Sequence, residues 1–422
     1  MVDGVVARFD ARTASNLVPA DPEEILACVF DPHRRGELYP LYHALRDVAP
    51  VHRTRHRNLK DVWVVSRFDD ALELYRNPRA VSDPATAEHF NHGGKGGHFY
   101  QMLKQMMLFL GSEQHAHVRR IVMKAFTPRA IARVTPVTRD IAAALIGEVA
   151  ADHHMDIVEQ FAYRLPLRVI AYILGVPEDD FATVETYAYD FARGSELAVD
   201  ETEQSRRADR AAVGFRDYFE HLIARRRNER RDDVLSALIA AEDEGRHLDF
   251  DQLVATCVLL LQAGHETTSD TIGLSMIALF RHPAQMQLLR QDPTLTKSAV
   301  EELLRFDPTN QMNNRLLLDD IRLGDVHISA GEQVAILIGA ANRDPTHFEK
   351  PDALDLERPI SLHVAFAFGA YYCVGNALAR AELQVALRSL LDAFPALRPA
   401  GETFRWRDTL RNRGPAELLV EW

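Results

Sequence analysis

The chain has 422 residues, a formal net charge of −12 and a hydrophobic content of 47%. The acidic balance excludes general nucleic-acid binding, which needs a basic surface, and the apolar content is sufficient for a large buried core. The cysteines Cys28, Cys257 and Cys373 lie far apart and form no CxxC pair, which is typical of a protein in a reducing compartment. Neither the N-terminal residues 1–8 nor the longest apolar patch, 257–261, approaches the roughly 20 apolar residues that span a bilayer. We therefore expect a cytoplasmic protein without a membrane anchor.

The first hundred residues combine irregular chain with short elements. Three prolines interrupt residues 1–35, so we expect no long element there. The sequence pattern predicts a helix over 38–48 and two paired strands at Val51–Thr54 and Val62–Val65. The glycine-rich stretch 83–98 lacks the Gly-x4-Gly-Lys-Ser/Thr spacing of a phosphate loop, so a flexible loop is predicted instead.

Met and Leu are frequent in the next segment, Phe99–Leu110. This composition is typical of an adaptable apolar pocket wall, and equally of a plain core helix. His115 and Arg119 follow four residues apart, so on a helix they share one face and could grip a carboxylate. A solvated helix face is the alternative. A zinc site at His115 and His117 is not expected, because no other clear ligands accompany them.

Residues 137–246 show a helical pattern, with breaks predicted near Pro166, Gly175–Pro177 and Gly194. The charged runs within 225–233 indicate solvent-facing turns. No internal repeat or low-complexity segment is visible in the sequence.

A very long helix is predicted over 250–281, where Pro283 stops it. Its apolar pattern is interrupted at 263–268 by the hexapeptide Ala-Gly-His-Glu-Thr-Thr. Gly costs about 1 kcal/mol in a helix and threonines compete for backbone hydrogen bonds, so this local violation indicates function. Ala263 and Gly264 lie one turn before the threonines and predict a small-residue notch beside a hydroxyl, with room for a diatomic ligand. The alternative is a kinked core helix.

Glu302 and Arg305 lie three residues apart on a further predicted helix, where they can pair on one face. Strand-like segments follow at 321–323 and 334–338, with Gly331 in the turn between them.

The stretch 366–375 is apolar and punctuated by glycine, and it runs into a helix predicted over Asn376–Phe394. Cys373 therefore lies beside the free amides and the positive dipole end of a helix, which favour a thiolate. Gly369 and Gly375 bracket the sulfur, where a missing Cβ lets a flat cofactor approach the backbone. One axial thiolate is a known way to hold heme iron, and a structural buried cysteine is the alternative.

Together these motifs resemble those of the cytochrome P450 family over most of the chain. The Phe-x-x-Gly-x-x-x-Cys-x-Gly stretch is similar to the family's heme-binding loop, and the hexapeptide at 263–268 matches its oxygen-activation motif. The resemblance implies a mainly α fold with small β-sheets, formed by one domain over residues 1–422. It also implies heme b (iron protoporphyrin IX) between the long distal helix and the helix that follows Cys373.

The resemblance implies roles for individual residues. Cys373 would be the metal ligand, and Glu266 and Thr267 would be the catalytic pair that supplies protons. The other residues implied to contact the cofactor are His115, Arg119, Ala263, Gly264, Arg315, Phe366, Gly369, Tyr371 and Gly375.

Tyr371 departs from the His or Arg that the family usually carries at this position to bind a heme propionate. Propionate contacts are therefore expected to rest more on the basic residues at 115, 119 and 315. The resemblance also implies a structural trio of Glu302, Arg305 and Arg358 that holds the cysteine loop in position. Removing one member would leave a buried charge unpaired, typically a loss of about 3–5 kcal/mol.

The implied activity is heme-thiolate monooxygenation, in which one oxygen atom from O2 enters a small organic, secondary-metabolite substrate. Nothing in the sequence resembles a fused flavin or iron–sulfur domain, so electrons are expected from a separate ferredoxin-type protein with its reductase. The protein itself is expected to be a monomer. Candidate docking residues are the basic side chains near the heme-contacting segments, namely Arg119, Arg120, Lys124, Arg380 and Arg388.

Three alternatives stay open at this point. The same fold can catalyse oxidative coupling or ring formation without net oxygen insertion. The chain could also be a non-catalytic heme-binding protein, or a helical protein without heme. The substrate itself is not defined, because pocket-lining loops vary freely on one scaffold.

Overall fold

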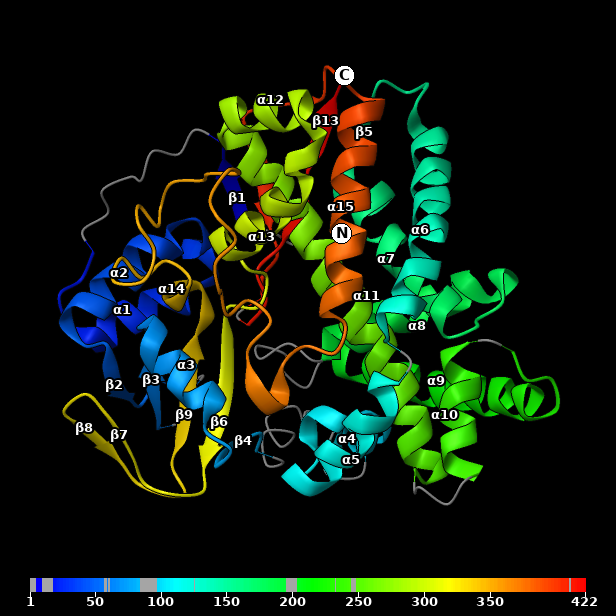
Figure 1. The fold of residues 1–422 in the computed structure, drawn as a ribbon, viewed down its shortest axis with the longest axis horizontal. Helices are drawn as coiled ribbons and strands as arrows, with labels where there is room; N and C mark the ends of the chain where they lie inside the picture. Colours follow the sequence, from blue (N-terminus) through cyan, green and yellow to red (C-terminus); the bar gives the residue numbers. More distant parts are fainter. Residues whose placement is uncertain are drawn as a thin grey trace.

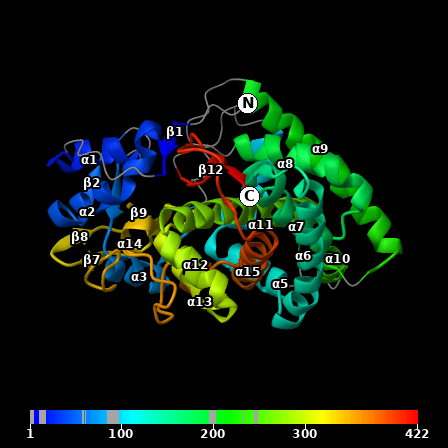
Figure 2. The ribbon, with the colours of Figure 1, turned by 90° about the horizontal axis from the view of Figure 1, so that it is seen from above.

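The computed structural model describes residues 5–9, 18–56, 59, 61–83, 97–124, 126–194, 203–231, 233–243, 248–409 and 411–422. Helices dominate this part of the chain, and the five-stranded sheet lies to one side of them (Figure 1). The same division into a helical part and a smaller strand-containing part is visible from above (Figure 2). The predicted fold class, mainly α with small β-sheets, is therefore confirmed.

The α-helices are α1 (Pro22–Val29), α2 (Leu38–Val48), α3 (Phe68–Arg76), α4 (His98–Gln105), α5 (Ser112–Met123), α6 (Pro128–Val149), α7 (Arg164–Ile173), α8 (Phe181–Gly194), α9 (Glu203–Asn228), α10 (Val234–Asp243), α11 (Phe250–Arg281), α12 (Pro283–Gln291), α13 (Thr296–Phe306), α14 (Ile338–Ala341) and α15 (Asn376–Ala393). Short 3-10 turns are η1 (Pro32–Glu37), η3 (Met107–Phe109), η5 (Glu178–Asp180), η6 (Pro293–Leu295) and η7 (Gly369–Tyr371), and η4 (Val158–Ala162) is a π turn. The strands are β1 (Val5–Arg8), β2 (Val51–Thr54), β3 (Val62–Val65), β4 (Ala80–Val81), β5 (His154–Asp156), β6 (Met312–Leu317), β7 (Ile321–Leu323), β8 (Val326–Ile328), β9 (Gln333–Leu337), β10 (Arg398–Pro399), β11 (Thr403–Trp406), β12 (Pro415–Glu417) and β13 (Leu419–Glu421).

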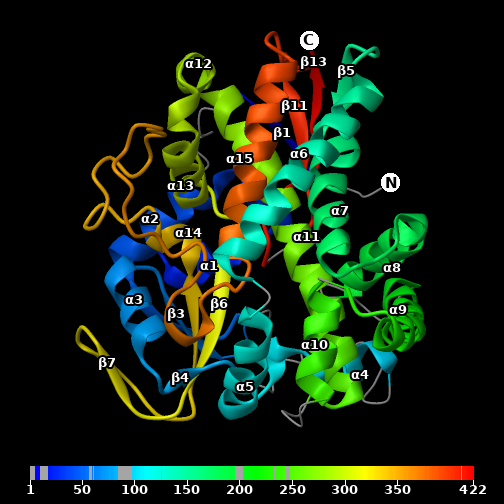
Figure 3. The same cartoon turned by 45° about the vertical axis from the view of Figure 1, so that its right-hand side comes forward.

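Helix α11 runs through the middle of the helical part and packs against α7 and α15 (Figure 3). The Asp249 side chain accepts a hydrogen bond from the Gln252 N–H and so caps the helix start. Pro283 begins α12, and the bounds predicted for the long helix are confirmed. Between 253 and 279 every residue is buried except those at 262–264 and 266–267, so the helix opens only where its apolar pattern is interrupted.

The largest sheet has the strand order β2-β3-β9-β6-β4. β2 and β3 pair antiparallel, which confirms the predicted hairpin, and β3 pairs parallel with β9. β7 and β9 also lie where strands were predicted, although β8 between them was missed. Gly331 has a φ of 85° in the turn before β9, a conformation that glycine adopts without strain. This sheet matters for the site because β6 carries Arg315.

The C-terminal strands connect distant parts of the chain. β11 pairs with β1 and β12, and β13 pairs with β10 and β5. β12 contacts α11, where Pro415 would collide with any side chain placed at Gly273. The segment between β11 and β12 is therefore held beside the long helix.

Two predictions about the N-terminal half are wrong. The first 35 residues are not irregular throughout, because they contain β1 and α1. Pro22 stands at the first position of α1, where it begins a helix instead of breaking one, and the Asp21 side chain caps that start. The break predicted near Pro166 lies earlier, at β5 and the π turn η4, since Pro166 fits within the first turn of α7.

A third correction concerns the charged run near 226. Arg226 is 1% exposed, so it does not lie on a solvent-facing turn. Its guanidinium lies 2.9 Å from the Asp233 carboxylate and donates a hydrogen bond to the Gly175 carbonyl oxygen at 2.6 Å. This arginine ties the end of α9 to the loop after α7.

The main hydrophobic core surrounds α11, and a second core lies between α3 and the large sheet. Within the described ranges, no helix combines the length and the apolar character that crossing a membrane requires. Cys28, Cys257 and Cys373 are free thiols.

Candidate functional site

The loop before α15 holds Cys373 in a defined position. The Cys373 N–H donates to the Phe366 carbonyl oxygen at 3.0 Å, and the Asn376 side-chain amide donates to the Cys373 carbonyl oxygen at 2.7 Å. The Phe366 ring lies 4.5 Å from the Arg380 guanidinium carbon. These contacts close the loop into a narrow turn directly at the start of α15.

The two glycines of this loop, Gly369 and Gly375, have different surroundings. Gly369 has a φ of 69°, and a side chain there would collide with the Tyr75 carbonyl oxygen. Its lack of a side chain is thus required by the fold of the loop against α3, which the sequence did not reveal. At Gly375 an added Cβ would meet no atom within 4 Å, so this residue leaves open space beside the sulfur.

Two opposing influences act on the pKa of Cys373. Burial raises the pKa of the thiol, while the N–H of Gly375 and the charges of Arg119 and Arg380 lower it. The thiolate would therefore need a stronger positive partner than the protein itself supplies, as a metal ion provides.

A basic and aromatic cluster formed by His115, Arg119, Arg315, Tyr371 and Tyr75 lies near this loop. The Arg315 guanidinium carbon lies 4.8 Å from the Tyr371 ring and 5.1 Å from the Tyr75 ring. His115 and Tyr371 have ring centroids 4.3 Å apart. The sequence predicted four of these five residues, and Tyr75 was missed because it belongs to α3, far away along the chain.

The charges of this cluster are unbalanced. Burial, together with Arg119 and Arg315, lowers the pKa of His115 to about 4, so it is neutral at physiological pH. Burial lowers the pKa of both Arg119 and Arg315, and within the part of the chain that the structure describes neither has a carboxylate partner. Two partly or fully buried cations without an anion suit the carboxylates of a bound cofactor.

The open face of α11 carries Ala263 and Thr267. The Thr267 hydroxyl donates to the Ala263 carbonyl oxygen at 2.8 Å, and both residues are accessible although the rest of the helix is mostly buried. At Gly264 an added Cβ would lie 3.1 Å from the Ile170 side chain of α7, so this glycine also allows the close packing of α7 on α11. Gly264 is itself partly exposed beside Ala263, and its contact with a cofactor stays a prediction.

Glu266 lies between two arginines from distant segments. Its carboxylate is 2.8 Å from Arg193 Nη2 on α8 and 3.3 Å from Arg407 Nη1 after β11. Burial alone would raise the pKa of Glu266, but Arg407 and Arg193 hold it below its usual value. Neither arginine carries a local sequence signal, so only the tertiary structure identifies them.

The predicted structural trio is confirmed. Arg305 Nε lies 2.7 Å from the Glu302 carboxylate, and Arg358 Nε lies 3.1 Å from it. Glu302 also accepts a hydrogen bond from the backbone N–H of Asp355. The trio fastens the segment that leads to the cysteine loop onto α13.

Two of the proposed docking cations are already engaged. Arg380 pairs with Glu301 at 2.6 Å, and Arg388 pairs with Asp392. Arg120 and Lys124, at the end of α5, are exposed. Among these candidate docking residues, the positive charge available to a partner protein therefore lies more on α5 than on α15.

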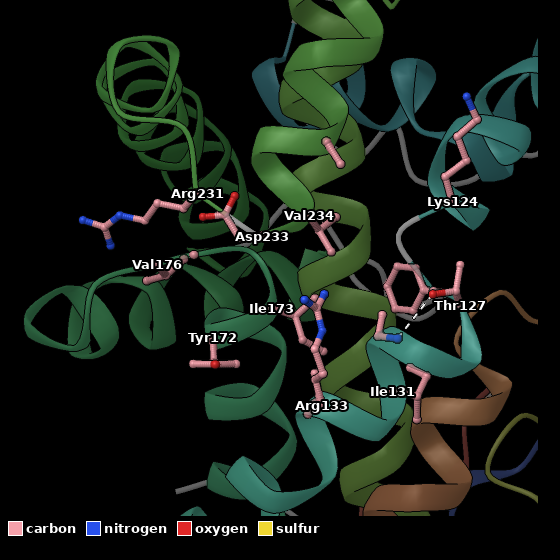
Figure 4. Close-up of a pocket in the computed structure, with 15 residues that line it drawn as sticks. Lys124, Thr127, Ile131, Arg133, Tyr172, Ile173, Val176, Arg231, Asp233 and Val234 are labelled. Atoms are coloured by element: carbon pink, nitrogen blue, oxygen red, sulfur yellow. Dashed lines mark hydrogen bonds between the residues drawn. The ribbon is translucent and has the colours of Figure 1, made fainter.

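A separate cavity of about 500 Å³ lies between the start of α6, α7 and α10 (Figure 4). Its wall includes Ile131, Ile173 and Val234, together with the basic side chain of Arg133. None of the candidate site residues contributes to this wall. The predicted catalytic residues Glu266 and Thr267 lie instead on α11.

The comparison with known proteins agrees with this geometry. The family model described as Cytochrome P450 matches residues 181–408. Cytochrome P450 107B1 of Saccharopolyspora erythraea is 35% identical over 399 residues, which cover 93% of this chain and 96% of that protein. The mycinamicin IV hydroxylase/epoxidase of Micromonospora griseorubida is 35% identical over 386 residues, covering 90% of this chain and 94% of that protein.

A solved structure extends the likeness to the fold. The crystal structure of CalO2 superimposes with a TM-score of 0.87 at 33% sequence identity. The match covers 96% of this chain and 99% of CalO2. The similarity therefore includes both the long helix α11 and the cysteine-led helix α15.

Proposed function

The chain belongs to the cytochrome P450 family, and from this premise we propose that it inserts one oxygen atom from O2 into a small organic substrate of secondary metabolism. As a member of this family it is a monooxygenase, an oxidoreductase that uses heme b and O2. The proposal rests above all on the basic cluster beside Cys373, where Arg119 and Arg315 have no carboxylate partner among the described residues. These residues fit a cofactor that brings iron to the sulfur and carboxylates to the arginines.

We assign the cofactor contacts as follows. Cys373 would hold the iron through its thiolate, and the open space at Gly375 would admit the edge of the ring. Arg119 and Arg315 would bind the propionates, with Tyr371 and neutral His115 packed beside them. When bound, heme b supplies the O2 chemistry and the oxidising power.

Two residues at the opening of α11, Thr267 and Glu266, would order water and deliver protons. The Thr267 hydroxyl donates a hydrogen bond to the Ala263 carbonyl oxygen. Rotation of this side chain would let the hydroxyl donate into the opening instead. Glu266 would carry protons towards it from the side of Arg193 and Arg407. A positioned carboxylate that passes protons contributes typically 10²–10⁴-fold to a rate.

The substrate class is supported by the relatives. The similar enzyme of Micromonospora griseorubida is described as a hydroxylase/epoxidase of mycinamicin IV. In the present chain, α4, η3 and the residue between them contribute Phe99, Met102, Met106 and Met107 to the main core. Methionine-rich walls adapt to irregular apolar molecules, which favours a bulky organic substrate over a small polar one.

We further propose that the protein acts as a single-domain monomer in the cytoplasm and receives electrons from a ferredoxin-type protein with its reductase. The three free thiols suit a reducing compartment. Exposed Arg120 and Lys124 would contact an acidic partner. Reversing both charges should slow reduction by ferredoxin and weaken its salt dependence, whereas an unchanged rate would refute this docking site.

The function is tested by turnover with a surrogate ferredoxin and reductase in isotopically labelled O2. A panel of macrolide, terpenoid and aromatic compounds is first screened for spectral shifts on binding. The proposal expects one labelled oxygen atom in the product of a binding compound. A product formed from such a compound without labelled oxygen would contradict it.

A further inference from the structure

Asp270 is a second buried acid beside Glu266, and the notch motif does not include it. It lies one turn further along α11, and its side chain is 2% exposed. Arg407 Nη1 lies 3.0 Å from Asp270 Oδ1 and 3.3 Å from Glu266 Oε1. A single guanidinium nitrogen thus contacts both carboxylates.

The enclosure of Asp270 is built from several segments. The Thr309 hydroxyl, after α13, lies 3.4 Å from Asp270 Oδ2 and also donates to the Arg413 carbonyl oxygen at 2.8 Å. A side chain at Gly414 would collide with the Asp270 carboxylate, so the backbone before β12 covers it. Among the described residues, the charged groups that act most strongly on Asp270 are Arg407, Glu266 and, from α8, Arg193.

The two acids respond to this environment in opposite directions. Burial raises the pKa of Asp270 to about 7, with Arg407 opposing the shift and the negative charge of Glu266 adding to it. The pKa of Glu266 lies below its usual value, because Arg407 and Arg193 outweigh burial. Around pH 7 the pair therefore gains or loses a single proton, and Asp270 is the acid that binds this proton more strongly.

We propose that Asp270 is a positioning residue that controls how firmly Arg407 holds Glu266 during proton delivery. This inference rests on the proposed function. With Asp270 protonated, the ion pair of Arg407 is with Glu266 and not with Asp270, and Arg407 and Arg193 together fix the Glu266 carboxylate. When the proton passes from an Asp270 oxygen to a Glu266 oxygen, Arg407 is drawn to ionised Asp270, and neutral Glu266 is released to pass the proton on. The net charge of the pair does not change.

Infrared spectroscopy of the protein tests the resting state directly, without turnover. Wild type should show a protonated-carboxyl band that disappears around pH 7, and Asp270→Asn should lack this titrating band. Asp251→Asn is the matched control, because Asp251 lies on the same helix but is 52% exposed and pairs with Arg216. If no carboxyl titrates between about pH 6 and 8 in wild type, the proposal is overturned whether or not the variant folds.

Turnover then tests the role in proton delivery. Wild-type activity should decline as pH rises through 7, whereas Asp270→Asn should lack this decline and should consume about tenfold more O2 per product formed. The control should behave as wild type. A normal thiolate spectrum of the reduced carbon monoxide complex in Asp270→Asn, combined with unchanged coupling and pH profile, would reject the inference and leave the proposed function intact. Loss of that spectrum in wild type would instead reject the proposed function.

Discussion

Arg193 Nη2 on α8 lies 2.8 Å from the Glu266 carboxylate on α11, and both side chains are only 15% exposed. This ion pair joins two helices that are separated by 73 positions along the chain. Arg407, which follows β11 near the C-terminal end of the chain, contacts the same carboxylate. Glu266 is therefore held by two arginines from different segments. A movement of α8 would consequently change how firmly the Glu266 side chain is held.

The first prediction concerns this pair. Arg193→Gln should destabilise the fold by about 1–3 kcal/mol at neutral pH, less than a fully unpaired buried charge costs, because Arg407 remains. The lowered pKa of Glu266 means that its stabilising contribution exists above the usual carboxyl range and is lost as pH falls. Acid unfolding should therefore begin at higher pH in the variant. Urea unfolding at several pH values measures this, with the exposed Arg210→Gln as control.

Arg210 pairs with Glu203 on the surface, where both side chains are at least 60% exposed. Its replacement should change stability by less than about 1 kcal/mol. Equal acid-unfolding profiles for Arg193→Gln and Arg210→Gln would show that the pair with Glu266 has no special weight.

The second prediction separates two similar hydroxyls of α11. Thr267 donates to the Ala263 carbonyl oxygen at 2.8 Å, and Thr271 donates to the Thr267 carbonyl oxygen at 2.7 Å. Only Thr267 lies at the opening, since Thr271 is buried. Thr267→Ala should raise the O2 consumed per product formed by about tenfold or more, because water and protons are no longer ordered there. Thr271→Ala should remain coupled, and full coupling in Thr267→Ala would mean that another group orders the proton path.

The third prediction contrasts two buried glutamates. Glu302 holds two arginines, so Glu302→Gln should cost about 3–5 kcal/mol. Glu382 on α15 is fully buried, and burial raises its pKa well above the usual range, which the nearby Thr268 hydroxyl offsets only in part. Burial therefore favours the neutral form of Glu382 in the fold, and Glu382→Gln should change stability by less than about 1 kcal/mol.

The pH dependence of the free energy of unfolding tests whether the pKa of Glu382 is raised in the fold. Because its pKa is raised in the fold, wild type loses stability as pH rises above the ordinary carboxyl range, and Glu382→Gln should lack this loss. Chemical unfolding between about pH 4 and 8 measures the difference. Equal costs for the two glutamine variants would contradict the assignment of a neutral Glu382.

The fourth prediction compares the two glycines that flank the sulfur. Gly369→Ala should destabilise the protein without heme by about 1–3 kcal/mol, because φ is 69° and the new side chain meets the Tyr75 carbonyl oxygen. Gly375→Ala should leave that stability unchanged, since nothing lies within 4 Å of its added Cβ. Heme titration should then show weaker binding for Gly375→Ala. Equal stability of both variants would mean that the loop tolerates a side chain against α3.

The helices with the strongest signals could be predicted from sequence. For α11 and α15, long apolar patterns end at proline, glycine or a capping residue, so both were predicted within a residue at each end. The helix α1 was missed because Pro22 was taken as a break, although its role depends on whether the chain after it is helical. Local patterns thus predicted long elements better than short ones.

The site divides in the same way. Cys373, Thr267 and Glu266 lie in local motifs and were predicted, whereas Arg407 and Arg193 reach Glu266 from segments with no motif of their own. Asp270 could have been suspected from its spacing of four residues after Glu266 on one helix face. Its burial and its shared arginine depend on the C-terminal segment, and these emerge only from the tertiary structure.

The role of the Cys373 sulfur as the protein ligand of a heme iron can be read from one spectrum. The reduced carbon monoxide complex of the wild-type protein should show the red-shifted Soret band of thiolate ligation. Cys28→Ser, which alters a free cysteine of α1, should keep that band, and Cys373→Ser should lose it. A thiolate band that persists in Cys373→Ser, or its absence from heme-loaded wild type, would contradict the account.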